Sequence, residues 1–145
     1  MAPKKTLAEL KRHERVNFIL AERLMQVLEQ IEAQEERYDH DNPGDWQRFD
    51  FKRHEVKCNS ACCFAGHTVA MFADEGTPDD IREDEVVSEA VRLLEIYRSD
   101  YAGFHIFFDF AREWPVTFKN EWGRVAPACV RRRIEHYIET GSMFP

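Results

Sequence analysis

The residues best suited to chemistry lie in one short segment, 54–67. It holds three of the four cysteines and two of the six histidines of the 145-residue chain. Zinc binds thiolates and neutral imidazoles, usually four of them arranged in a tetrahedron. His54, Cys58, Cys63 and His67 could form such a set, because a helix over 61–73 would place Cys63 and His67 on one face. The segment lacks the paired Cys-x-x-Cys spacing of zinc modules. We therefore expect a protein without a cofactor, with a bound zinc ion as the alternative.

Two other roles for the same thiols compete with a metal site. A cysteine in the first turn of a helix, such as Cys62 or Cys63, loses its proton more easily, and a nearby histidine could act as its base. No oxyanion or substrate motif accompanies this arrangement. The role we favour is structural, because cysteine is among the residue types most often buried. The thiols would then stay reduced, or Cys58 and Cys63 would be joined as a pair.

The chain lacks the motifs that mark the common enzyme classes. It has no P-loop, dinucleotide-binding fingerprint, His-Glu-x-x-His, Gly-x-Ser-x-Gly or EF-hand pattern. We therefore expect a protein that is not an enzyme.

Helices are expected to position the cysteine-histidine segment. Thr6 and Glu9 form a capping box, and apolar residues follow at helical spacing. This pattern predicts an N-terminal helix over 6–36, with an interruption near His13. The apolar positions on which it rests are Leu7, Leu10, Val16, Ile19, Leu20, Leu24, Val27, Leu28 and Ile31.

Three more helices are expected after the loop at 41–45. One runs over 61–73, a second starts at Thr77-Pro78 and reaches Tyr97, and the last runs from Pro127 to Gly141. The aromatic run at 104–110 fits helical spacing, although a short strand there or at 46–56 is an alternative. The prediction is an all-α, compact single-domain bundle of about five or six helices, with the option of a short strand pair. It spans 1–145, with residues 1–5 flexible and 58–141 as the core.

The charge balance limits the classes of partner. A net charge of −7 disfavours long-range attraction to nucleic acid and to anionic membranes. No apolar stretch is long enough to span a bilayer, so we expect a cytoplasmic protein. The basic run Arg131-Arg132-Arg133 covers about three-quarters of a helical turn and is expected to be solvated.

Acidic residues are concentrated between Asp74 and Glu89. Solvated helix faces are the simplest explanation. A second explanation is an acidic surface that meets a basic partner or mimics nucleic acid. The candidate contact residues for a partner are the acids Asp79, Asp80, Glu83 and Asp84 and the aromatic residues Trp114 and Trp122.

The segment Cys58–His67 reads Cys-Asn-Ser-Ala-Cys-Cys-Phe-Ala-Gly-His. It resembles a signature of small uncharacterised bacterial and phage proteins, Cys-Gly-Thr-x-x-Cys-Ile-Ala-Gly followed by Trp or His. The resemblance covers about residues 27–141 and includes Trp114-Pro115 and the stretch 133–141. It implies that Cys58 and Cys63 are the paired cysteines, and it places His67 where many relatives carry Trp, which disfavours a metal role.

No activity is established for that family, so the resemblance implies no reaction. The leading hypothesis is a non-catalytic protein-binding module, encoded by a phage or mobile element, that modulates a host or defence protein. A small zinc- or thiol-dependent protein built on residues 54–67 is one alternative. A nucleic-acid-binding or nucleic-acid-mimicking protein is the other.

Overall fold

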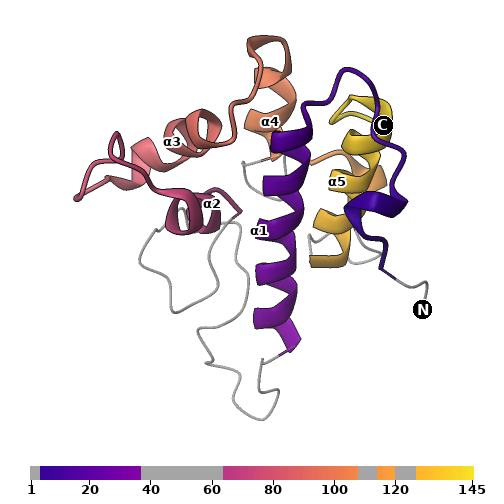
Figure 1. Cartoon of the computed structure of the whole chain (residues 1–145), viewed down its shortest axis with the longest axis horizontal. Helices are drawn as coiled ribbons and strands as arrows, with labels where there is room; N and C mark the ends of the chain where they lie inside the picture. Colours follow the sequence, from indigo (N-terminus) through magenta and orange to yellow (C-terminus); the bar gives the residue numbers. More distant parts are fainter. Residues whose placement is uncertain (1–3, 37–63, 108–113, 120–126) are drawn as a thin grey trace.

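The long helix α1, Phe18–Glu36, is the element against which the other long helices pack (Figure 1). The computed structural model describes residues 4–36, 64–107, 114–119 and 127–145. Helix α5, Pro127–Thr140, lies beside α1 on one side. On its other side lies α2, Phe64–Phe72, which also packs on α3, Val86–Leu93.

The N-terminal region is helical only in part. The capping box is present: Glu9 closes a single turn of 3₁₀ helix, η1, Leu7–Glu9, by accepting the Thr6 backbone N–H at 3.2 Å. Residues 10–17 then run outside any helix, so the expected interruption near His13 is confirmed and extends over these residues. His13 donates its backbone N–H to the Ile138 carbonyl at 2.7 Å, which ties this connection to α5.

Helix α3 begins later than its sequence suggested. The prediction that Thr77-Pro78 starts a helix is wrong, because the Thr77 hydroxyl accepts the Asp74 backbone N–H at 3.1 Å and closes a turn instead. Thr77 also donates its own N–H to the Asp74 carbonyl at 3.0 Å. The helical stretch starts with the 3₁₀ turn η2, Glu83–Glu85, and continues as α3 to Leu93. Glu95, with φ of 55°, then turns the chain away.

The aromatic run after Gly103 is helical as far as the structure describes it. A 3₁₀ turn, η3, Arg98–Asp100, leads into α4, Tyr101–Phe107, which buries Phe104 and Phe107 completely. The segments 46–56 and 108–110, where a strand was the alternative, lie outside the described residues. The short turn η5, Val116–Phe118, precedes α5.

Helix α5 matches its prediction at both ends. Pro127 begins it, and Gly141 follows its last residue with φ of 77°, a backbone conformation that glycine adopts without strain. Its buried stripe contains Val130, Ile134, Tyr137 and Ile138, as the spacing predicted.

The fold is all-α. The described residues contain no β-strand, and their buried apolar side chains form one hydrophobic core shared by α1 to α5. Among these residues no helix combines the length and the apolar character needed to cross a membrane.

Candidate functional site

Most of the predicted cysteine-histidine site lies outside the described residues. His54, Cys58, Cys62 and Cys63 fall in that part of the chain, so neither the metal set nor the Cys58–Cys63 pair has a geometry here. His67 is described and lies on α2 with only 4% of its surface exposed. Within the described ranges no group of three or more His, Cys, Asp or Glu side chains could hold a metal ion.

The acidic segment after α2 begins with a clamped turn. Arg92 of α3 donates from Nη2 to Asp74 Oδ1 at 2.6 Å and from Nε to Glu89 Oε1 at 2.7 Å. The Asp74 carboxylate also accepts the Gly76 backbone N–H at 2.9 Å. The Arg92 hydrogen bond is the main reason that the pKa of Asp74 falls to about 2. This turn is therefore held to α3 by charge-assisted hydrogen bonds.

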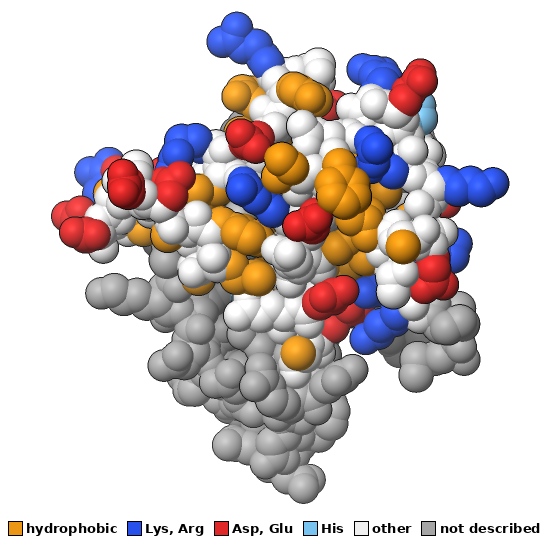
Figure 2. Space-filling view, in the orientation of Figure 1, with side chains coloured by type: hydrophobic (Ala, Val, Ile, Leu, Met, Phe, Trp, Pro, Cys, Tyr) orange, Lys and Arg blue, Asp and Glu red, His pale blue; other side chains and the backbone are white. Residues whose placement is uncertain are grey.

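The candidate acidic contact residues lie beyond that turn, at one end of the molecule (Figure 2). Asp79 and Asp80 are exposed, and no cation among the described residues pairs with them. Asp84 is exposed as well, but Arg82 donates to its carboxylate at 3.2 Å. The Glu83 side chain lies outside the described part. The acidic surface expected from the sequence is thus present at Asp79 and Asp80 and partly neutralised at Asp84.

Trp114 is not available to a partner. It is 2% exposed, and its indole N–H donates to the Phe107 carbonyl at 3.2 Å. Its ring stacks on Phe107 with 5.4 Å between ring centres. Its proposed role as an exposed contact is therefore wrong, because the residue completes the core. Trp122 lies outside the described residues.

The three arginines of α5 have three different environments. Arg133 is fully buried, which corrects the expectation that the whole run is solvated. Arg131 binds Glu32 of α1 through two hydrogen bonds, at 2.7 and 2.8 Å, and Glu135 at 2.9 Å. Only Arg132 is exposed, and it donates to the Lys119 carbonyl at 3.2 Å.

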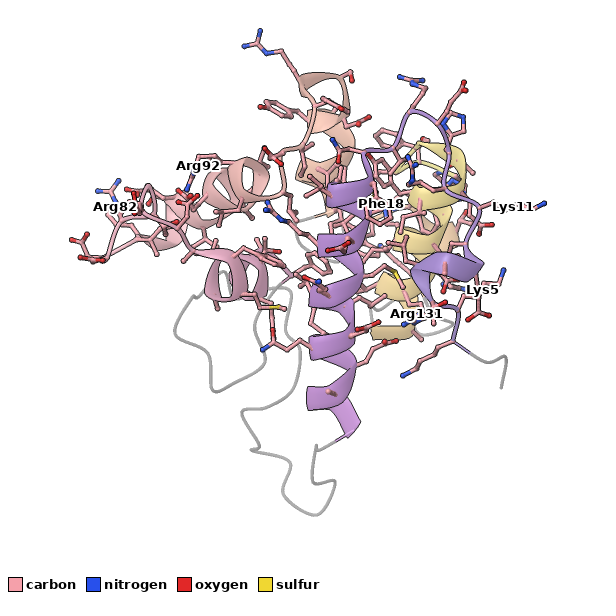
Figure 3. The ribbon with its side chains drawn as sticks, in the orientation of Figure 1. Lys5, Lys11, Phe18, Arg82, Arg92 and Arg131 are labelled. Atoms are coloured by element: carbon pink, nitrogen blue, oxygen red, sulfur yellow. The ribbon has the colours of Figure 1, made fainter. Side chains whose placement is uncertain are left out.

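A shallow pocket of about 240 Å³ lies over the Arg131–Glu32 ion pair. Its wall includes Lys4, Lys5 and Glu29. Figure 3 shows Lys5 and Arg131 on the same side of the molecule. Every nitrogen of the Arg131 guanidinium already donates a hydrogen bond to the protein. The floor of the pocket is therefore an ion pair that joins α1 to α5, and the guanidinium nitrogens of this pair are already hydrogen-bonded to the protein.

Large apolar side chains reach solvent at the start of α1, which the sequence analysis missed. Phe18 is 52% exposed and Ile19 48% exposed, although Ile19 was expected in the buried stripe. At about 100° per residue, Ile19 lies about 140° from Leu24, which places it outside the buried stripe. Phe18 shares its direction with the buried Met25, so the helical wheel does not account for its exposure. Figure 2 shows hydrophobic side chains on the surface around this half of α1.

Tyr97, from the connection between α3 and α4, and Tyr101, the first residue of α4, join this surface. Tyr97 is 50% exposed and Tyr101 is 38% exposed. The Asn17 side-chain amide donates to the Tyr97 hydroxyl at 3.4 Å, which brings together two segments 80 residues apart. Asn17 also accepts the Ile19 backbone N–H at 2.7 Å, so it caps α1 and fixes its first turn.

Arginines border the same surface. The Arg12 guanidinium lies over the Phe18 ring, 5.8 Å from its centre. Arg98 follows Tyr97 directly, and Arg15 is an exposed residue of the connection that precedes α1. We call this surface the aromatic–arginine face. It consists of Phe18, Ile19, Tyr97 and Tyr101 with Arg12, Arg15 and Arg98.

No protein-family model, curated protein or solved structure matches this chain. A function therefore has to be inferred from the chemistry of its own surfaces. Among the described residues, the aromatic–arginine face and the acidic end at Asp79 and Asp80 are two surfaces with exposed side chains suited to a protein partner.

Proposed function

We propose that the protein is a non-catalytic binding module whose partner is another protein, and that the partner docks on the aromatic–arginine face. The observation that carries the proposal is the gathering of four large, exposed apolar side chains from two distant segments. Aromatic residues and arginine are enriched in protein interfaces, and tyrosine and arginine often dominate the binding energy. The face has that composition.

The backbone beneath the face is held in place, which favours binding. Asn17 caps α1, and Arg12 donates to the Val16 carbonyl at 2.6 Å. On the other side, the Tyr137 hydroxyl donates to Asp100 at 3.1 Å and holds the turn that follows Tyr97. A surface that is already ordered loses less conformational entropy when a partner binds.

The acidic end of the molecule is the second candidate surface for a protein partner. Asp79 and Asp80 carry charge that no described cation neutralises, and Arg92 holds the neighbouring turn to α3. A basic partner would complement them. This surface has no exposed aromatic anchor, so it takes second place.

Site-specific photo-crosslinking in cells distinguishes the two surfaces. A photoreactive amino acid is placed at Ile19, at Tyr97, at Asp79 and, as an exposed apolar control on η5, at Val116. We expect Ile19 and Tyr97 to crosslink to the same protein and the other two positions not to do so. Each substituted protein is first compared with the unmodified protein by circular dichroism and thermal unfolding.

The same experiment can overturn the proposal. Crosslinks from Asp79 alone would transfer the binding role to the acidic end. Absence of crosslinks from both Ile19 and Tyr97, or the same pattern at Val116, would remove the aromatic–arginine face as a docking site.

A further inference from the structure

The segment after α5, residues 142–145, packs against both α4 and α5. The Met143 side chain is 3% exposed, and it lies against α4 where Gly103 leaves room for it. Arg133 of α5 donates from Nε to the Met143 carbonyl at 3.0 Å. About one turn further along α5, His136 donates from Nε2 to the Phe144 carbonyl at 2.7 Å. The segment is therefore held by one buried side chain and by two of its backbone carbonyls.

The link between this segment and α5 allows it to leave. Gly141, with φ of 77°, joins the two, and glycine adopts either hand of backbone without strain. Two backbone N–H groups of the segment have local acceptors: Ser142 donates to the Thr140 hydroxyl at 3.2 Å and Phe144 to the Ser142 hydroxyl at 3.1 Å. Displacement of the segment therefore exposes its buried side chain and breaks the two hydrogen bonds to α5, but it strains no backbone link.

The segment leaves the guanidinium of Arg133 incompletely bonded. This side chain is fully buried, and its Nη1 and Nη2 atoms have no hydrogen-bond partner among the described residues. A guanidinium presents Nε and one Nη along the same edge, a geometry that fits the two oxygens of a carboxylate. A peptide carbonyl offers one oxygen. The Met143 carbonyl accordingly bonds to Nε alone and leaves the charge without a carboxylate in the described part of the chain.

We infer that Gly103, Arg133 and the space that Met143 fills form a binding site for the free carboxyl terminus of another chain whose last residue is apolar. Residues 142–145 occupy this site when the ligand is absent. The last side chain of the ligand takes the place of Met143 beside Gly103. Its terminal carboxylate takes the position of the Met143 carbonyl and binds both Nε and the neighbouring Nη of Arg133.

The ligand neutralises a buried charge that the chain's own segment leaves without a counter-ion. A buried charge is unfavourable unless it is paired and hydrogen-bonded, so the carboxylate binds more favourably than the peptide carbonyl that it replaces. This site is separate from the aromatic–arginine face, and the inference does not depend on the proposed function.

Fluorescence anisotropy with a labelled peptide tests the inference on the intact protein. The peptide Glu-Thr-Gly-Ser-Met repeats residues 139–143 and is made with either a free carboxyl end or a carboxyl-terminal amide. We expect the free acid to bind about tenfold or more tightly than the amide, because only the acid forms charge-assisted hydrogen bonds along the guanidinium edge.

Two matched arginine variants locate the binding. Arg133→Met should bind the acid and the amide equally, because it lacks the guanidinium that distinguishes them. Arg132→Met removes the adjacent, exposed arginine and should keep the preference of the unmodified protein for the acid. Thermal unfolding first shows that each variant is folded.

A third variant tests the displacement of the segment. Met143→Ser removes the buried side chain that holds the segment in place, so the peptide no longer has to displace it. We expect this variant to bind the free acid about tenfold or more tightly than the unmodified protein.

The inference is overturned by any of three results. The first is equal affinity of the acid and the amide for the unmodified protein, or no binding of either peptide even to Met143→Ser. The second is a preference for the acid that persists in Arg133→Met. The third is an affinity that Met143→Ser leaves unchanged, since the peptide would then bind elsewhere.

Discussion

The guanidinium carbon of Arg133 lies 4.5 Å from the centre of the Trp114 ring, inside the core. The rings of Phe107 and Phe118 lie 5.7 and 5.2 Å from the same atom. Arg133 Nε donates to the Met143 carbonyl at 3.0 Å, while Nη1 and Nη2 have no hydrogen-bond partner among the described residues. Burial lowers the pKa of Arg133 to about 10. Cation–π contacts thus hold a buried charge that also ties the C-terminal residues to α5.

Replacement of Arg133 by methionine should change stability little. The variant loses the cation–π contacts and one hydrogen bond, but it removes a buried charge with two unsatisfied nitrogens. We expect the free energy of unfolding of Arg133→Met to stay within about 2 kcal/mol of the unmodified protein. Trp114→Ala should lose about 3–5 kcal/mol, because it opens a cavity in the core. Urea denaturation measures both, and a loss above about 4 kcal/mol in Arg133→Met would show that the charge itself is required.

Tyr137 should make the protein sensitive to alkaline pH. Burial, and then the Asp100 carboxylate, raise the pKa of its hydroxyl well above the usual value of 10. The unfolded chain therefore loses this proton near pH 10 while the folded protein keeps it, so stability falls as the pH rises from about 10 toward the folded pKa. Arg133 has the opposite effect on stability in this pH range. Its pKa is lower in the folded protein than in the unfolded chain, so the folded protein loses this proton first and stability rises with pH.

The Tyr137→Phe variant isolates the tyrosine contribution. At neutral pH it should be about 1 kcal/mol less stable, because the hydrogen bond to Asp100 is lost. Above about pH 10 the difference should shrink, since only the unmodified protein has this proton to lose. Urea denaturation at a series of pH values measures the difference. A gap that stays constant through pH 11 would contradict the assignment.

Gly103 should be intolerant of a side chain. A Cβ atom there would lie 2.8 Å from the Met143 Cβ, so α4 or the C-terminal residues would have to move. We expect Gly103→Ala to lower the free energy of unfolding by about 1–3 kcal/mol. Gly76→Ala is the matched control, since its nearest neighbour is the flexible end of Arg92 at 3.3 Å. Equal effects of the two substitutions on thermal unfolding would show that Met143 does not pack closely on α4.

The ion pair between Glu32 and Arg131 should contribute more than those on the surface. Their side chains are 10% and 12% exposed, and the pair joins α1 to α5. We expect Glu32→Gln to lose about 1–3 kcal/mol, because it weakens hydrogen bonds to a largely buried charge. Asp84→Asn removes the exposed pair with Arg82, and we expect less than about 1 kcal/mol. A similar loss in both variants would mean that burial gives the Glu32 pair no added strength.

Sequence patterns predicted the elements whose signals are local. Pro127 and Gly141 set the ends of α5, and Thr6 with Glu9 formed the expected capping box. The predicted start of α3 was wrong because a threonine hydroxyl before a proline can accept a backbone N–H either as a helix cap or as part of a turn. Here a distant residue, Arg92, holds Asp74 in the turn.

The surfaces could be predicted less well than the helices. Arg133 lies three residues after Val130 and four before Tyr137, so its spacing indicated burial, but its charge led to the opposite expectation. The aromatic–arginine face depends on contact between residue 17 and residue 97, which no local pattern contains. The cysteine-histidine segment has the residue types best suited to chemistry, and it lies largely outside the described residues.

Quantitative mass spectrometry of co-purifying proteins tests the docking face most directly. The unmodified protein is compared with Phe18→Asp and with Val116→Asp, after thermal unfolding has shown that all three are folded. One protein should be recovered with the unmodified chain and with Val116→Asp, and its yield should fall about tenfold or more with Phe18→Asp, as for loss of an interface anchor. Equal recovery with Phe18→Asp, or an equal loss with Val116→Asp, would contradict the account.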